Sequence, residues 1–416
     1  MTRRFWVETL GCPKNQVDSD KLTGALVADG LEPADAPGDA ELVVVNTCAF
    51  IADARQESVD AILALADMRP DGSRLVVTGC MAERYGDELA TALPEVDAVA
   101  GFASAVAVSL GRKPSTHAPD LDLLHLPRPK SNAPWAYVKV AEGCDRACGF
   151  CAIPSFRGPQ RSRTIDDVLA EVEALAVKEI VLVAQDLAAF GRDRGVGERA
   201  IVPLVRAVAD RVPRTRLLYL YPSDLTDELI DAICATGVPY FDLSLQHVSR
   251  PLVRSMRRWG DGARFLARIE AIRTREPDAA FRSNFIVGYP GETEADHDAL
   301  LRWIEAAQLD WCGFFAYSEE AGTAAAELGG KVEAQLIAER LTELRELQDS
   351  VTAARRDELL GTEVEVLVDE PGFGRSHREA PEIDGIITIA HDLAIGTFHN
   401  LVVKATAGPD LEAVAV

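Results

Sequence analysis

The stretch CDRACGFC at residues 144–151 is the most specific motif in this chain. It places Cys144, Cys148 and Cys151 at intervals of four and three positions, directly after an apolar run at residues 136–140. Thiolates are soft ligands that suit iron–sulfur clusters or zinc. A closed structural zinc site takes four ligands, and this stretch offers three, since the nearest histidines in sequence are His125 and His247. The stretch therefore favours a cluster over zinc.

Three cysteines on a four-iron cluster leave one iron open to a small ligand. The spacing, with Phe150 directly before the last cysteine, resembles the signature of the radical S-adenosylmethionine (SAM) superfamily. The resemblance implies that the amino and carboxylate groups of SAM bind this open iron. Three structural cysteines, or a zinc knuckle, are the alternatives for the same pattern.

A repeated strand–helix pattern surrounds this stretch. Apolar runs predict six strands at residues 136–140, 180–184, 216–221, 240–246, 281–287 and 312–317. Helical spacing separates them, for example at residues 166–177, 226–235 and 292–307. Six such units favour an incomplete α/β barrel over the complete eight-fold one. Active sites of such barrels lie at the carboxyl ends of the strands, which is where the cysteine loop falls.

Residues 1–100 show a second alternation of strands and helices. Strands are predicted at residues 3–10, 41–46 and 74–78, and helices at residues 18–29 and 51–65, which indicates a parallel sheet covered by helices. Cys12, Cys48 and Cys80 each follow one of these strands. Because carboxyl ends of parallel strands share one sheet edge, the three cysteines are expected to converge. Three unrelated buried cysteines are the alternative.

The flanking segments complete an α/β chain of several domains. Residues 111–134 contain five prolines and predict a linker, and residues 361–416 hold short β-rich runs that predict a small all-β barrel or sandwich. The expected division is an N-terminal domain at residues 1–110, a linker at 111–133, a partial (β/α)6 barrel at 134–350 and a β domain at 351–416. Cys234 and Cys312 fall within helical and strand patterns and are predicted to be packing residues.

Charge and hydropathy narrow the function classes. The net charge is −23, which argues against a protein that binds nucleic acid mainly through its overall field. No signal peptide and no apolar stretch of about 20 residues is recognised in the sequence, so a cytoplasmic protein without a membrane span is expected.

Over essentially its whole length the chain resembles the methylthiotransferase family, whose members combine a three-cysteine N-terminal domain, a radical SAM barrel and a C-terminal TRAM-type domain. Three motifs are similar to the RimO branch: LGCPKN at residues 10–15, PSFRG at 154–158 followed by RSR at 161–163, and GRS at 374–376 with APEIDG at 380–385. The MiaB branch, which modifies tRNA, typically carries a GCQMN-like version of the first motif.

The resemblance implies a sulfur-group transfer that adds CH3–S– to the β-carbon of an aspartate in small-subunit ribosomal protein S-twelve. It implies two [4Fe-4S] clusters, one on Cys144, Cys148 and Cys151 and an auxiliary one on Cys12, Cys48 and Cys80. It also implies an electron donor such as flavodoxin or ferredoxin. No conventional acid–base residue is expected. The SAM contacts that it implies are Phe150, Gln185, Ser283, Ile286, Val287 and Gly288.

Two other functions fit parts of the same sequence. One is a tRNA adenosine methylthiotransferase of the MiaB type, and the other is a non-catalytic iron–sulfur or zinc protein that docks on the ribosome. Residues 357–416 carry twelve acidic and three basic side chains, a balance that should repel RNA and attract a basic ribosomal protein. A solvated acidic surface without a partner is the alternative explanation of that balance.

Overall fold

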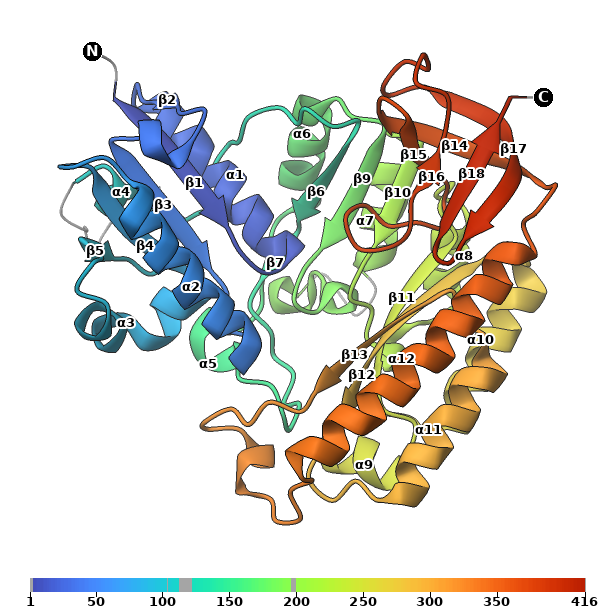
Figure 1. Ribbon diagram of the computed structural model, residues 1–416. Helices are drawn as coiled ribbons and strands as arrows, with labels where there is room; N and C mark the ends of the chain where they lie inside the picture. Colours follow the sequence, from blue (N-terminus) through green and yellow to red (C-terminus); the bar gives the residue numbers. More distant parts are fainter. Residues whose placement is uncertain (1–2, 103, 112–121, 196–199, 416) are drawn as a thin grey trace.

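The computed structural model describes residues 3–102, 104–111, 122–195 and 200–415. Figure 1 shows an N-terminal sheet in blue, a central set of strands and helices from green to orange, and a C-terminal barrel in red. None of the helices in the described ranges is both long and apolar enough to cross a membrane. Part of the predicted linker, residues 112–121, lies outside the described residues.

The N-terminal sheet is parallel throughout, as predicted. Its strands run in the order β2-β1-β3-β4-β5, and β3 is buried along its whole length. The helix predicted at residues 18–29 begins five residues earlier, because Pro13 occupies the first helical turn, where its missing N–H costs nothing. The bounds are β1 Arg4–Thr9, α1 Pro13–Ala28, β2 Glu32–Pro33, β3 Leu42–Thr47, α2 Ala52–Met68, β4 Arg74–Gly79, α3 Cys80–Ala92, β5 Ala98–Val99 and α4 Ala105–Ser109.

Six parallel strands form the central part, which confirms the predicted partial barrel. They make two three-stranded sheets, β10-β9-β6 and β11-β12-β13. A single bridge between Leu220 and Leu243 joins the two sheets. The strand predicted at residues 216–221 ends at Leu217, because Tyr219 adopts a φ of 65° and turns the chain. The bounds are β6 Trp135–Lys139, β9 Glu179–Val183, β10 Arg214–Leu217, β11 Tyr240–Gln246, β12 Ala280–Val287 and β13 Trp311–Ala316.

Amphipathic helices cover the outer face of these strands (Figure 1). Thr164, Thr226, Asp261 and Thr293 cap four of them through their side chains, so their first turns are well defined. Cys234 and Cys312 pack against the core between strands and helices, as predicted. The helices are α6 Ile165–Leu175, α7 Ile201–Ala209, α8 Asp227–Cys234, α9 Arg250–Ser255, α10 Gly262–Arg275, α11 Glu294–Ala307 and α12 Ala334–Asp357, and the cysteine loop lies between β7 Ala141–Glu142, α5 Ile153–Arg157 and β8 Arg161–Ser162.

The C-terminal segment is a closed five-stranded barrel, so the barrel and not the sandwich is correct. Its strands run β14-β15-β16-β18-β17 around a core that includes Val366, Leu401 and Val403. The bounds are β14 Glu363–Glu370, β15 Phe373–Arg375, β16 Ile387–Thr388, β17 Phe398–Ala407 and β18 Asp410–Val414.

Buried ion pairs attach both flanking parts to the central strands. Glu179 of β9 pairs with Arg216 of β10 at 2.7 Å and with Arg375 of the C-terminal barrel at 3.1 Å. On the N-terminal side, Glu171 of α6 pairs with Lys21 of α1 at 3.1 Å. These contacts join elements that are distant in sequence.

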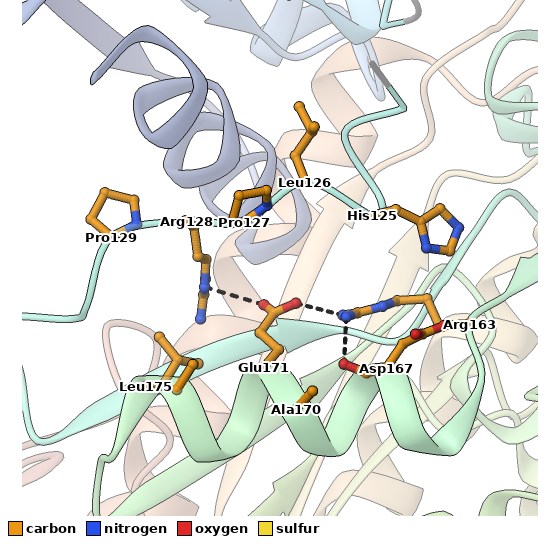
Figure 2. Close-up of a pocket in the computed structure, with 11 residues that line it drawn as sticks. His125, Leu126, Pro127, Arg128, Pro129, Arg163, Asp167, Ala170, Glu171 and Leu175 are labelled. Carbon is orange, nitrogen blue, oxygen red and sulfur yellow. Dashed lines mark hydrogen bonds and ion pairs between the residues drawn. The ribbon is translucent and has the colours of Figure 1, made fainter. Parts of the chain in front are cut away.

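A groove runs between the segment 125–129 and α6 (Figure 2). Within it, Glu171 also pairs with Arg128 at 3.2 Å and with Arg163 at 2.6 Å (Figure 2). The cations that line the groove are therefore held by carboxylates of the protein, and Arg128 pairs with Asp20 as well. We interpret the groove as the seam between the N-terminal and central parts.

Candidate iron–sulfur site

The first cysteine group lies at the carboxyl edge of the N-terminal sheet. Cys12 precedes α1, Cys48 directly follows β3, and Cys80 begins α3 directly after β4. Gly11 has a φ of 95°, and a Cβ at this position would lie 2.7 Å from the Cβ of Cys48. Only glycine allows the Cys12 loop to approach Cys48 so closely. The predicted convergence of these strand ends on one edge is what the structure shows.

The three thiols of this group interact electrostatically. Burial raises the pKa of Cys48 to about 12, and charge on Cys12 and Cys80 adds to that rise. Burial also acts to raise the pKa of Cys12, but Lys14 and Arg157 outweigh it, and the pKa falls below the ordinary thiol value. The thiolate, which is the form that binds metals, is thus favoured most at Cys12.

The second cysteine group lies in the loop between β7 and α5. The loop is anchored at both ends, since the backbone N–H of Cys144 donates to Gly158 O at 3.1 Å and that of Gly149 donates to Met256 O at 2.9 Å. Burial raises the pKa of Cys144 to about 11 and that of Cys151 to about 12. Cys144 and Cys151 therefore lie in a partly dehydrated part of a loop that backbone hydrogen bonds anchor.

The chemistry of these donors fits iron–sulfur clusters. Each group supplies three soft sulfur ligands, the number that leaves one iron of a four-iron cluster open. Within the described ranges, no three His, Cys, Asp or Glu side chains converge on the position of a single metal ion. Gln185 Oε1, just after the end of β9, is buried without a hydrogen-bond partner among the described residues. Such an orphaned acceptor at a strand end fits a polar ligand.

Arg157 connects the two groups. Its Nε and Nη2 lie 3.3 and 3.1 Å from Cys80 Sγ, and its Nη1 donates to both oxygens of Glu142 at 2.8 and 2.9 Å. Glu142 in turn accepts from the backbone N–H of Gly143, which precedes Cys144. One buried side chain therefore links a thiol of the first group to the loop that carries the second.

Lys139 and Asp18 complete a buried charge cluster around this link. Lys139 Nζ contacts Asp18 Oδ1 and lies 2.8 Å from Glu142 Oε2, while Arg157 lies 3.4 Å from Asp18 Oδ2. Burial acts to raise the pKa of Glu142, but Arg157 and Lys139 hold it well below its usual range. Two cations face two carboxylates, so the formal charges of these four side chains sum to zero without any contribution from the thiols.

Sequence reasoning did not identify Arg157 or Lys14 as site residues. Arg157 lies in the motif at residues 154–158 and Lys14 in the motif at residues 10–15, and both motifs contribute to the family resemblance. Their place in these motifs was the one feature of the sequence that pointed to the two residues. The Lys14 ammonium lies 3.2 Å from the centroid of the Tyr219 ring and is buried beside Cys12. Tyr219 is the residue with positive φ that ends β10, and such backbone strain is typical of functional sites.

Two of the predicted SAM contacts lie together near the second group. Phe150 and Ile286 both pack against an apolar cluster that includes Tyr289 and Met256. Gln185 donates from Nε2 to Glu142 at 2.9 Å, which leaves its Oε1 free to accept. These side chains surround the anchored cysteine loop.

The other predicted contacts are placed differently. Ser283 is fully buried, and its hydroxyl donates to Leu243 O at 2.7 Å. Val287 belongs to the core that faces the helices. Gly288 has a φ of 80°, and its N–H donates to Glu292 at 2.6 Å.

His247, at the end of β11, has a structural environment. Burial lowers its pKa to about 4, and its Nδ1 accepts from the backbone N–H of Ser249 at 3.0 Å. At the second group, Arg258 places Nη1 3.2 Å from Cys148 Sγ, so each cysteine group has one arginine against one of its sulfurs.

Three family models match successive parts of the chain. Residues 4–101 match the uncharacterized protein family UPF0004, residues 138–304 match the radical SAM superfamily, and residues 360–416 match the TRAM domain. These matches confirm that the barrel is a radical SAM fold and that the C-terminal barrel is of the TRAM type. They agree with the order expected from sequence.

Named relatives match over nearly the whole length of the chain. The chain is similar to the protein named ribosomal protein uS12 methylthiotransferase RimO of Moorella thermoacetica, with 43% identity over 94% of this chain and 93% of that protein. The proteins of the same name from Kineococcus radiotolerans and Streptomyces coelicolor are 41% and 39% identical, over 92% and 99% of this chain and 90% and 96% of theirs.

Solved structures show the same fold at low sequence identity. The radical SAM methyltransferase TsrM of Kitasatospora setae, with cobalamin and a [4Fe-4S] cluster bound, superposes with a TM-score of 0.55 at 16% identity. The match covers 78% of this chain and 77% of TsrM.

Proposed function

The chain belongs to the RimO family of ribosomal protein uS12 methylthiotransferases, and on this premise we propose that it adds a methylthio group to the β-carbon of an aspartate of that protein. It is a radical SAM enzyme that uses SAM and [4Fe-4S] clusters. The observation that carries the proposal is the presence of two three-cysteine groups, joined through Arg157 and Glu142, in a chain about 40% identical to RimO proteins over nearly its full length.

The two groups have separate tasks in this proposal. Cys144, Cys148 and Cys151 hold the cluster that binds SAM, and Cys12, Cys48 and Cys80 hold the auxiliary cluster. When bound, SAM and its cluster supply a carbon-centred radical able to remove an unactivated hydrogen, and the auxiliary cluster supplies the sulfur. Phe150, Gln185, Ser283 and the backbone of residues 286–288 are the proposed SAM contacts.

The chain itself contributes position and dehydration. The Arg157–Glu142 link and the anchored loop fix the two groups relative to each other, and fixed geometry is a major source of rate enhancement. Burial of Cys48, Cys80 and Cys144 helps to keep water from the reacting groups. Residues 1–110, 134–350 and 351–416, joined by the linker at 111–133, are the proposed functional units.

The surface of the C-terminal barrel supports a protein substrate over tRNA. Arg375 and Arg378 are buried in ion pairs, so Lys404 is the one exposed lysine or arginine among the described residues 357–415. Eight acidic side chains of the same segment are exposed: Asp357, Glu358, Glu363, Glu365, Glu370, Glu382, Asp392 and Glu412. An RNA-binding surface would present the opposite charge, whereas a basic ribosomal protein is complementary to this one.

The substrate can be tested with purified components. The anaerobically reconstituted chain, SAM and dithionite are incubated with ribosomal protein uS12 or with tRNA, and both products are analysed by mass spectrometry. We expect a gain of one CH2S unit on an aspartate of uS12 and none on tRNA, and no gain with Cys144→Ala. A gain on adenosine in tRNA would support the MiaB-type function instead. In the cell we propose that the reaction takes place in the cytoplasm, with a flavodoxin or ferredoxin in place of dithionite.

A further inference from the structure

Arg157 presents its guanidinium to the sulfur of Cys80 in a way that ordinary packing does not require. Both Nε and Nη2 face Cys80 Sγ, at 3.3 and 3.1 Å, and the side chain is only 3% exposed. The same Nη2 donates to Asn15 Oδ1 at 2.6 Å, and the guanidinium lies over the ring of Phe102. The orientation of the two N–H groups toward sulfur is thus fixed from several sides.

The charge of Arg157 is directed at the cysteine group in spite of its carboxylate partners. Its other edge is occupied by Glu142, whose second oxygen is taken by Lys139. Asp18 also faces Lys139, so Lys139 and Arg157 share the two carboxylates between them. Nη2, which faces Cys80, also lies 3.4 Å from Asp18 Oδ2, so the guanidinium gives the sulfur two N–H contacts while its charge is shared with carboxylates. The contacts lie in a region shielded from solvent, where electrostatic interactions are strong.

We propose that Arg157 is a positioning residue that raises the reduction potential of the auxiliary cluster through its two N–H···S contacts to Cys80. Hydrogen bonds to cluster sulfurs, net charge and solvent exposure set such potentials. A cation and two N–H donors at one ligand sulfur stabilise the reduced cluster, which carries one more negative charge. This inference rests on the proposed function, because it requires a cluster on Cys12, Cys48 and Cys80.

The test measures a potential, so it does not depend on catalysis. The full chain with Cys144, Cys148 and Cys151 changed to alanine is reconstituted, and its remaining cluster is titrated with dithionite and followed by electron paramagnetic resonance. Arg157→Met in this background should lower the midpoint potential of the cluster. At a fixed applied potential, the ratio of reduced to oxidised cluster should fall about tenfold, which corresponds to a shift of about 59 mV in a one-electron midpoint potential. Arg157→Lys, which keeps the charge but loses the fork, should give a smaller shift in the same direction.

Arg84→Met is the matched control. Arg84 is also an arginine of low exposure in an ion pair between the N-terminal and central parts. It contacts Glu320 and the carbonyl of Ala49, and among the described residues it contacts no sulfur. Its loss should leave the potential unchanged. An unchanged potential in Arg157→Met, or an equal shift in Arg84→Met, would overturn the inference.

The outcomes separate this inference from the proposed function. Absence of a four-iron cluster in the triple-alanine parent would contradict the auxiliary site itself. A loaded cluster with an unaltered potential in the Arg157 variants would contradict only the tuning role. Failure of both Arg157 variants to take up iron, while Arg84→Met loads normally, would also overturn the tuning role, because Arg157 would then be needed for assembly.

Discussion

Arg84 Nη1 of the N-terminal part lies 2.6 Å from Glu320 Oε2 in the loop after β13. Glu320 is buried, and it also pairs with Arg55 at 2.7 Å. Together with the Arg157–Glu142 link, this contact holds the first cysteine group against the second. Several consequences can be measured.

Glu320→Gln should reduce sulfur transfer far more than SAM cleavage. The variant loses the charge that holds Arg55 and Arg84, and a small displacement between reacting groups costs on the order of 100-fold in rate. The measurement is the ratio of methylthiolated uS12 to 5′-deoxyadenosine formed. Glu319→Gln, which removes an exposed partner of Lys331, is the control and should leave this ratio unchanged. Equal losses of transfer and cleavage in Glu320→Gln would contradict the positional role.

The two cysteine groups should be separable by mutation. Anaerobically reconstituted protein should hold about eight irons, and Cys12→Ala or Cys144→Ala protein about four. Cys144→Ala should lose reductive cleavage of SAM, whereas Cys12→Ala should keep cleavage and lose sulfur transfer. An iron content near four with all cysteines intact would refute the two-cluster assignment.

Acid should weaken the attachment of the C-terminal barrel through Glu179. Burial acts to raise the pKa of Glu179, but Arg216, Arg375 and Arg214 lower it to about 2. Between pH about 4.3, the ordinary glutamate pKa, and pH about 2, the unfolded chain therefore binds more protons at this position than the folded chain does. The stabilisation that the ion pairs of Glu179 provide is complete above this window and is lost as pH falls through it.

The measurement is the urea midpoint of unfolding as a function of pH. Glu179→Gln leaves buried arginine charge unpaired, so it should lower the free energy of unfolding by about 3 kcal/mol at neutral pH and flatten the acid dependence. Glu173→Gln, which removes an exposed partner of Arg211, should change neither quantity. A midpoint that falls as steeply with acid in Glu179→Gln as in the parent would exclude Glu179 as the cause.

The acidic face of the C-terminal barrel should contribute to substrate affinity. Glu363→Lys combined with Glu370→Lys should weaken binding of uS12 roughly tenfold at low salt. The loss should be smaller at high salt, because dissolved ions screen the attraction between exposed charges. Titration calorimetry at two ionic strengths checks this. Glu270→Lys combined with Glu305→Lys makes the same charge change on exposed positions of α10 and α11 and is the control. The same loss in both double variants would indicate a general charge effect.

Local sequence patterns were sufficient for most of the parallel strands. Apolar runs identified β1, β3 and β4 of the N-terminal sheet and the six central strands, but not the two-residue strands β2 and β5. The positions of Cys12, Cys48 and Cys80 after β1, β3 and β4 predicted their common edge. The conformation of Tyr219, which shortens β10, has no such signature, because a positive φ at tyrosine is imposed by surrounding contacts such as Asp242.

Long-range charge pairs were beyond the reach of sequence reasoning. Arg157 and Cys80 are 77 positions apart, and Arg84 and Glu320 are 236 apart, so no periodicity connects them. Arg214 and Arg216 are charged residues within a strand, which local patterns assign to a solvent-exposed face. In the structure both are buried, since the C-terminal barrel covers them and supplies backbone acceptors.

The mass of ribosomal protein uS12 from cells with and without this gene shows whether the chain modifies that protein. We predict that an aspartate of uS12 loses an increment of one CH2S unit when the gene is deleted, and that the intact gene restores it while a Cys12→Ala copy does not. An unchanged mass of uS12 after deletion would contradict the account.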